Sequence, residues 1–149
     1  MEIVDILSPA RCQNSVQASS KKRVLEHIAQ IAHTEITGSK ESDIYKHLLE
    51  RERLGSTGLG EGVAIPHCRI ENLSSILGIL IKLSDPVDFE SIDSKPVDLV
   101  FALMVPQEAS EEHLKTLATI AEHFSQPSFC SALREAKDDH ELYAVLVAA

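Results

Sequence analysis

The sequence predicts a three-layer α/β domain in which a mixed central sheet is covered by helices on both faces. Two runs, Leu77 to Leu83 and Val97 to Val105, are apolar almost without interruption. Such runs are typical of central strands that are buried on both faces. Helical patterns precede and follow them, which places helices on both sides of the sheet. Because the chain shows no linker, repeat or low-complexity tract, we expect one domain over residues 1–149.

Two amphipathic helices are expected before the first apolar run. Ser20 or Ser19 can cap the first helix, because a serine hydroxyl accepts from a free N–H in the first turn. Ser39 can cap the second helix, and Gly55 is the expected stop just past its end. The apolar stripes consist of Val24, Leu25, Ile28, Ile31 and Ala32 in the first helix and Ile44, Tyr45, Leu48 and Leu49 in the second.

After the second apolar run the chain becomes helical again. Between the two runs, residues 84–95 are polar with Asp and Pro turn signals, which predicts a loop. Ser110 can cap one helix, and Pro127 fits the first turn of the next. Asp138 followed by Glu141 is a capping-box pattern for a third helix. The side chains expected to point inward from the first of these helices are Leu114, Leu117, Ala118, Ala121 and Phe124.

Charge and composition narrow the possible functions. The 149 residues carry 14 basic and 23 acidic side chains, for a net charge of −9. Nucleic acid binding depends on basic charge, so we expect no nucleic acid partner, whereas an acidic surface suits a basic protein partner. No apolar run approaches the about 18 residues that span a bilayer, and the cysteines lack paired spacing. We therefore expect a soluble, cytoplasmic protein without membrane insertion.

The segment from Gly55 to His67, with the sequence GSTGLGEGVAIPH, carries the strongest functional signal. Four glycines in its first eight residues allow left-handed turns and close backbone approach. The apolar Val63–Ile65 predicts a short strand, and Pro66 ends its ladder because proline has no N–H to donate. His67 is therefore expected at the end of a strand, on a rigid support beside a loop rich in N–H groups. Such a place suits a nucleophile that meets a phosphate.

Other chemistries fit this segment poorly. The loop lacks the lysine of a P-loop, and its glycines at 58, 60 and 62 do not follow the dinucleotide-binding spacing. The chain has no His-Glu-x-x-His or paired Cys-x-x-Cys motif, so we expect neither a metal nor a cofactor. Cys68 and His67 are adjacent on an extended segment and should point to opposite faces, which argues against a thiol–imidazole dyad.

The same motif resembles the active-site segment of the mannitol/fructose-type enzyme IIA domains of the bacterial phosphotransferase system, most closely their nitrogen-regulatory branch. The resemblance extends from Asp5 to Ala148. It implies that His67 accepts a phosphoryl group on ring nitrogen Nε2 while a backbone carbonyl orients the other nitrogen. Neutral imidazole suits this role because its ordinary pKa is about 6.5. Two positions depart from the family pattern: Glu61, often asparagine, adds negative charge near the site, and Cys68 is often glycine.

The resemblance also implies two assisting side chains. The family carries an arginine at the position of Arg51, whose planar paired donors fit phosphoryl oxygens. A second family histidine, matched by His113, packs beside the reactive one and donates to the oxygens from a helix N-terminus. The hydroxyls of Thr57 and Ser56 are candidate phosphate donors, although turn hydroxyls more often bond their own backbone. The remaining histidines are expected to be ordinary surface or packed residues: His27, His33, His47, His123 and His140.

The function implied by this resemblance is that of a regulatory phosphocarrier. His67 would take a phosphoryl group from an HPr-like phosphocarrier protein, and the added charge would change contacts with regulatory or transport-gating proteins. Two alternatives remain. A sugar-specific IIA component, which passes the group to a IIB domain, shares the motif. A protein-binding module that is never phosphorylated would have no need of intact His67, Arg51 and His113.

Overall fold

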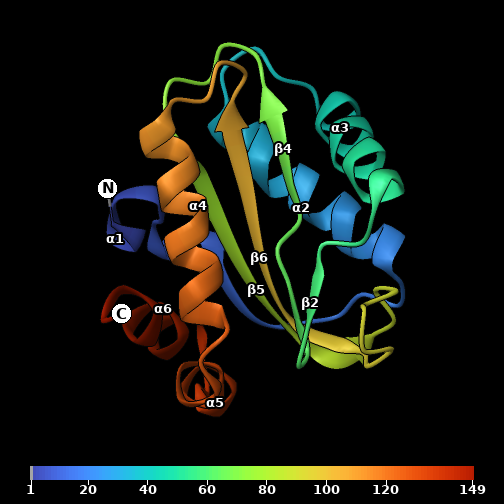
Figure 1. Ribbon diagram of the computed structural model, residues 1–149, viewed down its shortest axis with the longest axis vertical. Coiled ribbons are helices and arrows are strands. Elements are labelled where there is room, and N and C mark those ends of the chain that lie inside the picture. Colours follow the sequence, from blue (N-terminus) through green and yellow to red (C-terminus); the bar gives the residue numbers. More distant parts are fainter. Residues whose placement is uncertain (1) are drawn as a thin grey trace.

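The computed structural model describes residues 2–149, which form a mixed six-stranded sheet between two helical layers (Figure 1). The strands lie in the order β1 (Cys12–Val16), β5 (Leu77–Val87), β6 (Val97–Pro106), β3 (Val63–Ala64) and β2 (Gly58–Gly60). A further strand, β4 (His67–Ile70), also pairs with β6. The pairs β1–β5, β3–β6 and β4–β6 are parallel, and the pairs β5–β6 and β2–β3 are antiparallel. The predicted three-layer α/β fold is confirmed.

Helices cover both faces of the sheet and explain why its central strands are apolar throughout. One face packs against α2 (Lys21–Glu35) and α3 (Glu41–Leu54). The other packs against α1 (Ile3–Ile6), α4 (Glu111–Phe124), α5 (Pro127–Glu135) and α6 (Asp139–Val147). A short 3-10 turn, Pro9–Arg11, leads into β1. No helix within residues 2–149 combines the length and the apolar character needed to cross a membrane.

The two predicted central strands are β5 and β6, which are antiparallel neighbours. β5 continues to Val87, so the first part of the loop expected at 84–95 is strand instead. The reason is that Val87 pairs with Val97 after a register shift and is itself buried. Strands β1, β2 and β4 were not predicted, because their short segments lack a long apolar run.

The helix boundaries agree with most of the capping signals. The hydroxyl of Ser20 accepts from the N–H of Arg23, which confirms the cap of α2. The expected cap of α3 is wrong: Lys40 occupies that position, and the Ser39 hydroxyl donates to the Ile36 carbonyl at 2.7 Å. Gly55 ends α3 as predicted, with its N–H donating to the Glu52 carbonyl.

Three later caps are confirmed, and the inward face of α4 is confirmed in part: Phe124 is buried, and Leu117 and Ala121 are partly buried against the core. Ser110 caps α4, Pro127 opens α5, and Asp138 caps α6. The buried residues of α4 are Thr116, Ile120 and Phe124. Leu114 is 51% exposed, because the helix turns this side chain toward an open groove instead of the core.

Candidate functional site

His67 is the first residue of β4 rather than the residue after a strand, which corrects the sequence-based expectation. β3 ends at Ala64, and pairing with β6 resumes at His67 opposite Leu103. Proline has no N–H to donate, but the carbonyl of Pro66 accepts from the N–H of Leu103 at 2.9 Å. This bond keeps the chain next to β6, so that pairing resumes at the next residue. The strand position fixes the direction of the side chain: His67 is half-buried, whereas Cys68 points to the opposite, buried face.

The ring of His67 is oriented by the backbone. Its Nδ1 lies 2.8 Å from the carbonyl oxygen of Ile65. Since a carbonyl can only accept, Nδ1 carries the proton and Nε2 presents a lone pair. The carbonyl is itself held in place, because the N–H of Ile65 donates to the carbonyl of Thr57 at 3.0 Å. This arrangement makes Nε2 the nucleophilic atom of the ring.

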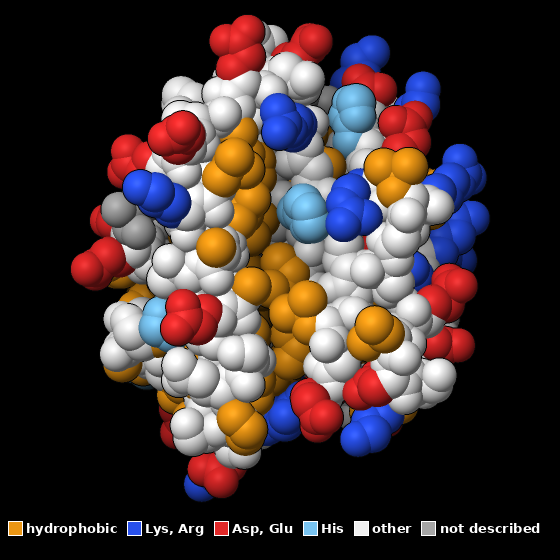
Figure 2. Space-filling view, in the orientation of Figure 1, with side chains coloured by type: hydrophobic (Ala, Val, Ile, Leu, Met, Phe, Trp, Pro, Cys, Tyr) orange, Lys and Arg blue, Asp and Glu red, His pale blue; other side chains and the backbone are white. Residues whose placement is uncertain are grey.

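The ring lies in an open groove of about 650 Å³ between α3, β4 and α4. Figure 2 shows apolar side chains along this groove, with a histidine and a basic side chain next to each other at its edge. The apolar lining includes Leu54, Val105, Leu114 and Leu117, and the polar lining includes His47, Arg51, Arg69 and Gln107. The groove is therefore open and has both apolar and polar side chains on its walls.

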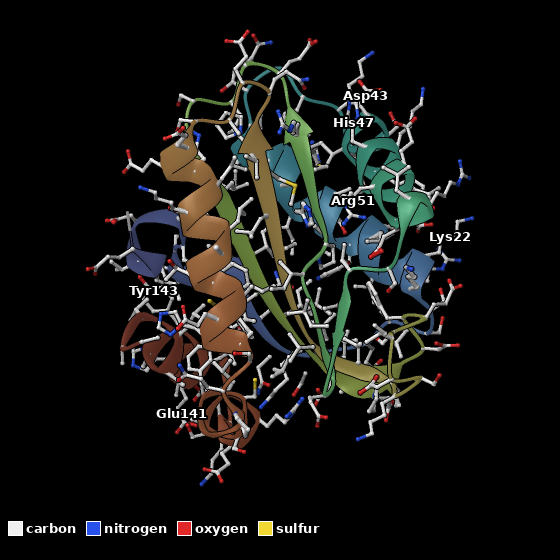
Figure 3. The ribbon with its side chains drawn as sticks, viewed as in Figure 1. Lys22, Asp43, His47, Arg51, Glu141 and Tyr143 are labelled. Carbon is white, nitrogen blue, oxygen red and sulfur yellow. The ribbon has the colours of Figure 1, made fainter. Side chains whose placement is uncertain are left out.

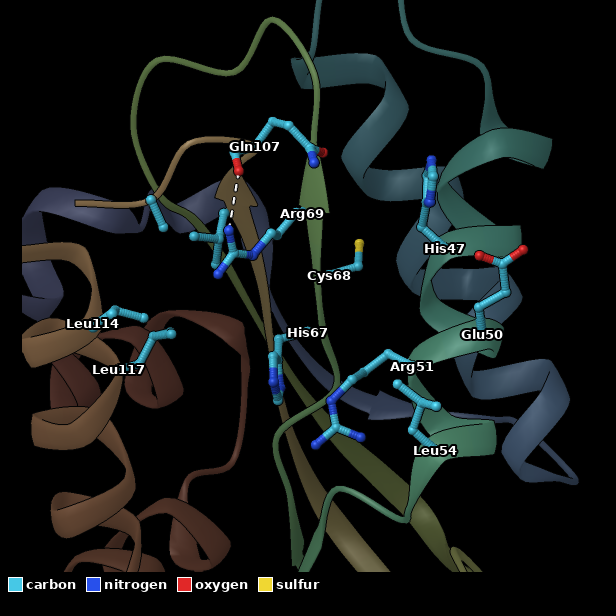
Figure 4. Close-up of a pocket in the computed structure, with 12 residues that line it drawn as sticks. His47, Glu50, Arg51, Leu54, His67, Cys68, Arg69, Gln107, Leu114 and Leu117 are labelled. Carbon is cyan, nitrogen blue, oxygen red and sulfur yellow. Dashed lines mark hydrogen bonds between the residues drawn. The ribbon is translucent and has the colours of Figure 1, made fainter. Parts of the chain in front are cut away.

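Arg51 lies beside His67. It belongs to the last turn of α3 and faces the strands, whereas Lys22 lies at the outer edge of the molecule (Figure 3). Its Nη1 donates to the carbonyl of Gly55 at 2.9 Å, which steadies the guanidinium. Figure 4 shows the guanidinium extending toward the His67 ring. The structure thus brings these two predicted site residues together, and a guanidinium at this place can bind phosphoryl oxygens.

Thr57 and Ser56 line a smaller pocket of about 210 Å³ together with His67 and Arg51. Their hydroxyl protons are already used within the protein. The Thr57 hydroxyl donates to the Glu52 carboxylate, and the Ser56 hydroxyl donates to the Phe89 carbonyl at 2.7 Å. In this structure both hydroxyls fix the loop, and phosphate binding by either one stays a prediction.

His113 lies in the first turn of α4, as expected, but it is not among the residues that line the groove around His67. Its Nδ1 accepts from the N–H of Ser110 at 3.1 Å as part of a capping box. The residues of α4 that line the groove are Leu114 and Leu117. Because Nδ1 is an acceptor here, Nε2 carries the proton and is a donor. Its assistance to phosphoryl transfer stays a prediction.

Residues 5–149 match the family model described as phosphoenolpyruvate-dependent sugar phosphotransferase system, EIIA 2. The chain belongs to this family. Among curated relatives, a nitrogen regulatory protein of Pseudomonas aeruginosa is 42% identical over 147 residues, covering 99% of this chain and 96% of the relative. One of Bradyrhizobium diazoefficiens is 41% identical over 146 residues, covering 98% and 95%.

Solved structures agree. The IIA-Ntr nitrogen regulatory protein of Neisseria meningitidis superposes on this EIIA type-2 chain with a TM-score of 0.91 at 38% identity, covering 97% of this chain and 98% of the other. The IIA mannitol protein of Escherichia coli, with a TM-score of 0.75 at 18% identity over 94% and 98%, shares the fold. The nitrogen-regulatory resemblance read from the motif is confirmed.

Four polar residues that line this EIIA groove were not predicted as site residues from the sequence: His47, Glu50, Arg69 and Gln107. Arg69 follows His67 by two positions on β4, and its Nη1 donates to the Gln107 carbonyl at 3.1 Å (Figure 4). His47, which was expected to be an ordinary helical histidine, precedes Arg51 by one turn of α3 and also lines the groove. The period of two in a strand would have found Arg69 had β4 been recognised. The i, i+4 spacing on a helix would have found His47.

Side chains from distant segments hold the glycine loop of the EIIA domain. Gly62 has φ +80°, where an L side chain is strained, and a Cβ there would also displace Nη2 of Arg134, so glycine is favoured. Arg134 pairs with Asp98 and donates to the Glu61 carbonyl at 2.8 Å. Asp93 accepts from the N–H of Glu61 at 2.9 Å. Backbone N–H groups donating to Asp93 hold the pKa of its carboxyl below the usual range.

The two departures from the family pattern differ in their place: Glu61 lies outside the groove, whereas Cys68 follows His67 on β4 and lines it. Glu61 is exposed in the turn between β2 and β3 and lines neither pocket that contains His67. Its carboxylate is thus no part of the pocket walls, and any effect of its charge on the site stays a prediction. Cys68 is buried with its Sγ 3.7 Å from Sδ of Met104, and burial raises its pKa to about 12. A thiol so buried is not a nucleophile at neutral pH.

Proposed function

We propose that this chain is a cytoplasmic regulatory phosphocarrier that accepts a phosphoryl group on Nε2 of His67 from an HPr-like phosphocarrier protein. The observation that supports this most is the hydrogen bond between Nδ1 of His67 and the Ile65 carbonyl. It leaves Nε2 as the nucleophile. The open groove around the ring gives a carrier protein access to it.

The transfer follows from this geometry. The Nε2 lone pair attacks phosphorus, the P–N bond of the carrier's phosphohistidine breaks, and its electron pair returns to the carrier's ring. As the new bond forms, positive charge develops on the His67 ring, and the Ile65 carbonyl dipole stabilises it at Nδ1–H. Arg51 binds the phosphoryl oxygens. Positioning and charge stabilisation suffice for such a step, so we expect no metal or cofactor.

The regulatory output rests on the site's exposure and on the relatives. The curated proteins at 41% and 42% identity are named nitrogen regulatory proteins. Phosphorylation adds a charge of about −1.5 to −2 to a side chain that lines this open groove. Such a change can shift binding of a regulatory or transport-gating protein by about 1–3 kcal/mol, the usual size of coupling between states.

A sugar-specific role is the second candidate, because the family description names sugar transport. A fructose-specific EIIABC component of Bacillus subtilis matches 98% of this chain at 24% identity, although the match covers 23% of that protein. In this role His67 would pass the phosphoryl group on to a IIB domain. The higher identity of the nitrogen regulatory relatives favours the regulatory role.

One experiment separates these roles. The protein is phosphorylated with enzyme I, phosphoenolpyruvate and an HPr-like carrier from its host. It is then mixed with the host's fructose- and mannitol-type IIB domains. We expect slow or no transfer to any IIB domain. The unphosphorylated and phosphorylated forms are each immobilised, and they should retain different amounts of a regulatory protein from the host extract. Rapid transfer to a IIB domain, with equal retention by both forms, would establish the sugar role instead.

A further inference from the structure

Glu52 is a buried carboxylate in an otherwise solvated run of charges. It lies on the last turn of α3 and is 6% exposed, whereas Arg53 beside it is exposed. Burying a charged carboxylate costs free energy unless hydrogen bonds and an opposite charge compensate for it. The contacts that compensate this charge are connected to the reactive histidine through further hydrogen bonds.

Thr57 and Lys21 compensate this charge. The N–H of Thr57 lies 3.1 Å from Oε1 and 3.0 Å from Oε2 of Glu52, and the Thr57 hydroxyl also donates to Oε1. Nζ of Lys21 lies 3.4 Å from Oε2. Lys21 comes from the first turn of α2 and also donates to the Phe89 carbonyl at 3.4 Å. One carboxylate thus joins α2, α3 and the glycine loop.

From Thr57 the hydrogen bonds continue to the His67 ring. The Thr57 carbonyl accepts from the N–H of Ile65 at 3.0 Å, and the Ile65 carbonyl accepts from Nδ1 of His67 at 2.8 Å. Each bond in this series restrains the residue that makes the next bond. Glu52 does not line the groove that contains His67, so it acts on the ring only through these intermediates.

We propose that Glu52 is a positioning residue for His67. Through Thr57 and Ile65 it holds the ring with the proton on Nδ1 and with Nε2 directed to the groove. Without the carboxylate, the loop would lose the acceptor that fixes Thr57, and the Ile65 carbonyl would lose its fixed position. The kinetic consequence rests on the proposed phosphoryl transfer, but the effect on the ring does not.

The test uses the full chain with substitutions along this series. Glu52→Gln removes the charge, Thr57→Val removes the hydroxyl at similar size, and Thr57→Ser keeps the hydroxyl. Glu90→Gln is the matched control: Glu90 also pairs with Lys21, at 3.7 Å, but its side chain is 79% exposed. The tautomer of His67 is read from its ¹⁵N ring shifts at pH 8.5, about two units above the ordinary imidazole pKa.

The wild type, Thr57→Ser and Glu90→Gln should show the Nδ1–H tautomer. Glu52→Gln and Thr57→Val should show a larger Nε2–H population. Their maximal rate of phosphoryl transfer should fall about tenfold, the lower end for loss of an orienting partner, with an unchanged KM for the carrier. The ¹⁵N spectrum of the His67 ring needs no carrier protein, so it tests the positioning role independently of phosphoryl transfer. If the wild type accepted no phosphate, only the proposed function would be excluded.

Thermal unfolding of each variant separates positioning from loss of fold. Should Glu52→Gln fail to fold, Thr57→Val decides, because it leaves the carboxylate and Lys21 in place. The proposal is overturned if the folded variants keep the wild-type tautomer and rate. It is equally overturned if their rate falls only in proportion to the folded fraction.

Discussion

Nδ1 of His67 and the carbonyl oxygen of Ile65 are 2.8 Å apart, although only Pro66 separates the two residues in the chain. Donor and acceptor therefore belong to one short segment of the chain. Proline restricts the backbone between donor and acceptor, since its ring fixes φ. The nucleophilic nitrogen is therefore oriented before any partner arrives, and transfer needs no rearrangement of the ring.

Replacing Arg51 with Lys should slow phosphoryl transfer to His67. Lysine keeps the charge but loses the planar paired donors that match phosphoryl oxygens. We expect a loss of about 100-fold, the low end for removing one charge-stabilising donor, because the groove is open to water. Rapid-quench transfer from the labelled carrier measures it. Arg53→Lys, on the exposed side of α3, serves as the control, and equal rates for all three proteins would exclude the role of Arg51.

Replacing His113 with Ala tests the second histidine. If its Nε2–H donates to the phosphoryl oxygens, transfer should slow about 10- to 100-fold. The variant also loses the bond from the Ser110 N–H, so unfolding is measured in parallel. His123→Ala, in the last turn of α4, is the control. A small loss of stability with a normal transfer rate would show that His113 only caps the helix.

Arg69 should contribute less than Arg51 to the rate of phosphoryl transfer to His67. It lies on the same strand face as His67 but is exposed and already donates to the Gln107 carbonyl. For a solvated charge we expect Arg69→Gln to slow transfer about fivefold, or about 1 kcal/mol. The same rapid-quench measurement shows it. An effect as large as that of Arg51→Lys would mean that Arg69 binds the phosphoryl group directly.

Asp93 should make stability depend on acid pH. Hydrogen bonds from the N–H groups of Glu61 and Lys95 lower its pKa from the ordinary 3.8. Because the folded-state pKa is the lower one, the stabilisation is complete above 3.8 and disappears as the pH falls through the folded value. The difference in thermal unfolding between wild type and Asp93→Asn should therefore be constant above about pH 5 and shrink as the pH falls below 3.8. A difference that stays constant over the whole acid range would contradict this account.

Local signals in the sequence predicted most helix caps and the two central strands, although the cap expected at Ser39 was wrong. The caps at Ser20 and Ser110 and the strands β5 and β6 followed from hydroxyl positions and apolar runs. The buried face of α4 could not be predicted fully from apolar residues, because Leu114 is apolar yet faces the open groove. Apolar character alone cannot distinguish a core face from one side of a groove.

The site was predictable to the same extent. The motif identified His67, and the resemblance supplied Arg51, which the structure places beside it. The spacing of four from Ile44 and Leu48 puts Glu52 on the buried face of α3, but it does not show what could compensate a buried charge there. Its burial depends on contacts with Thr57 and with Lys21 at the start of α2, about 30 positions earlier in the chain. Residues positioned by such distant contacts become visible only in the folded structure.

The central claim is that His67 alone accepts the phosphoryl group, and the most direct test is to locate the phosphate. The wild type and His67→Ala are incubated with enzyme I, ³²P-phosphoenolpyruvate and an HPr-like carrier, then digested and mapped by mass spectrometry at neutral pH. We predict one acid-labile phosphate per wild-type chain, on the peptide that contains His67, and none on His67→Ala. Labelling of His67→Ala to the wild-type level, or no labelling of the wild type, would contradict the account.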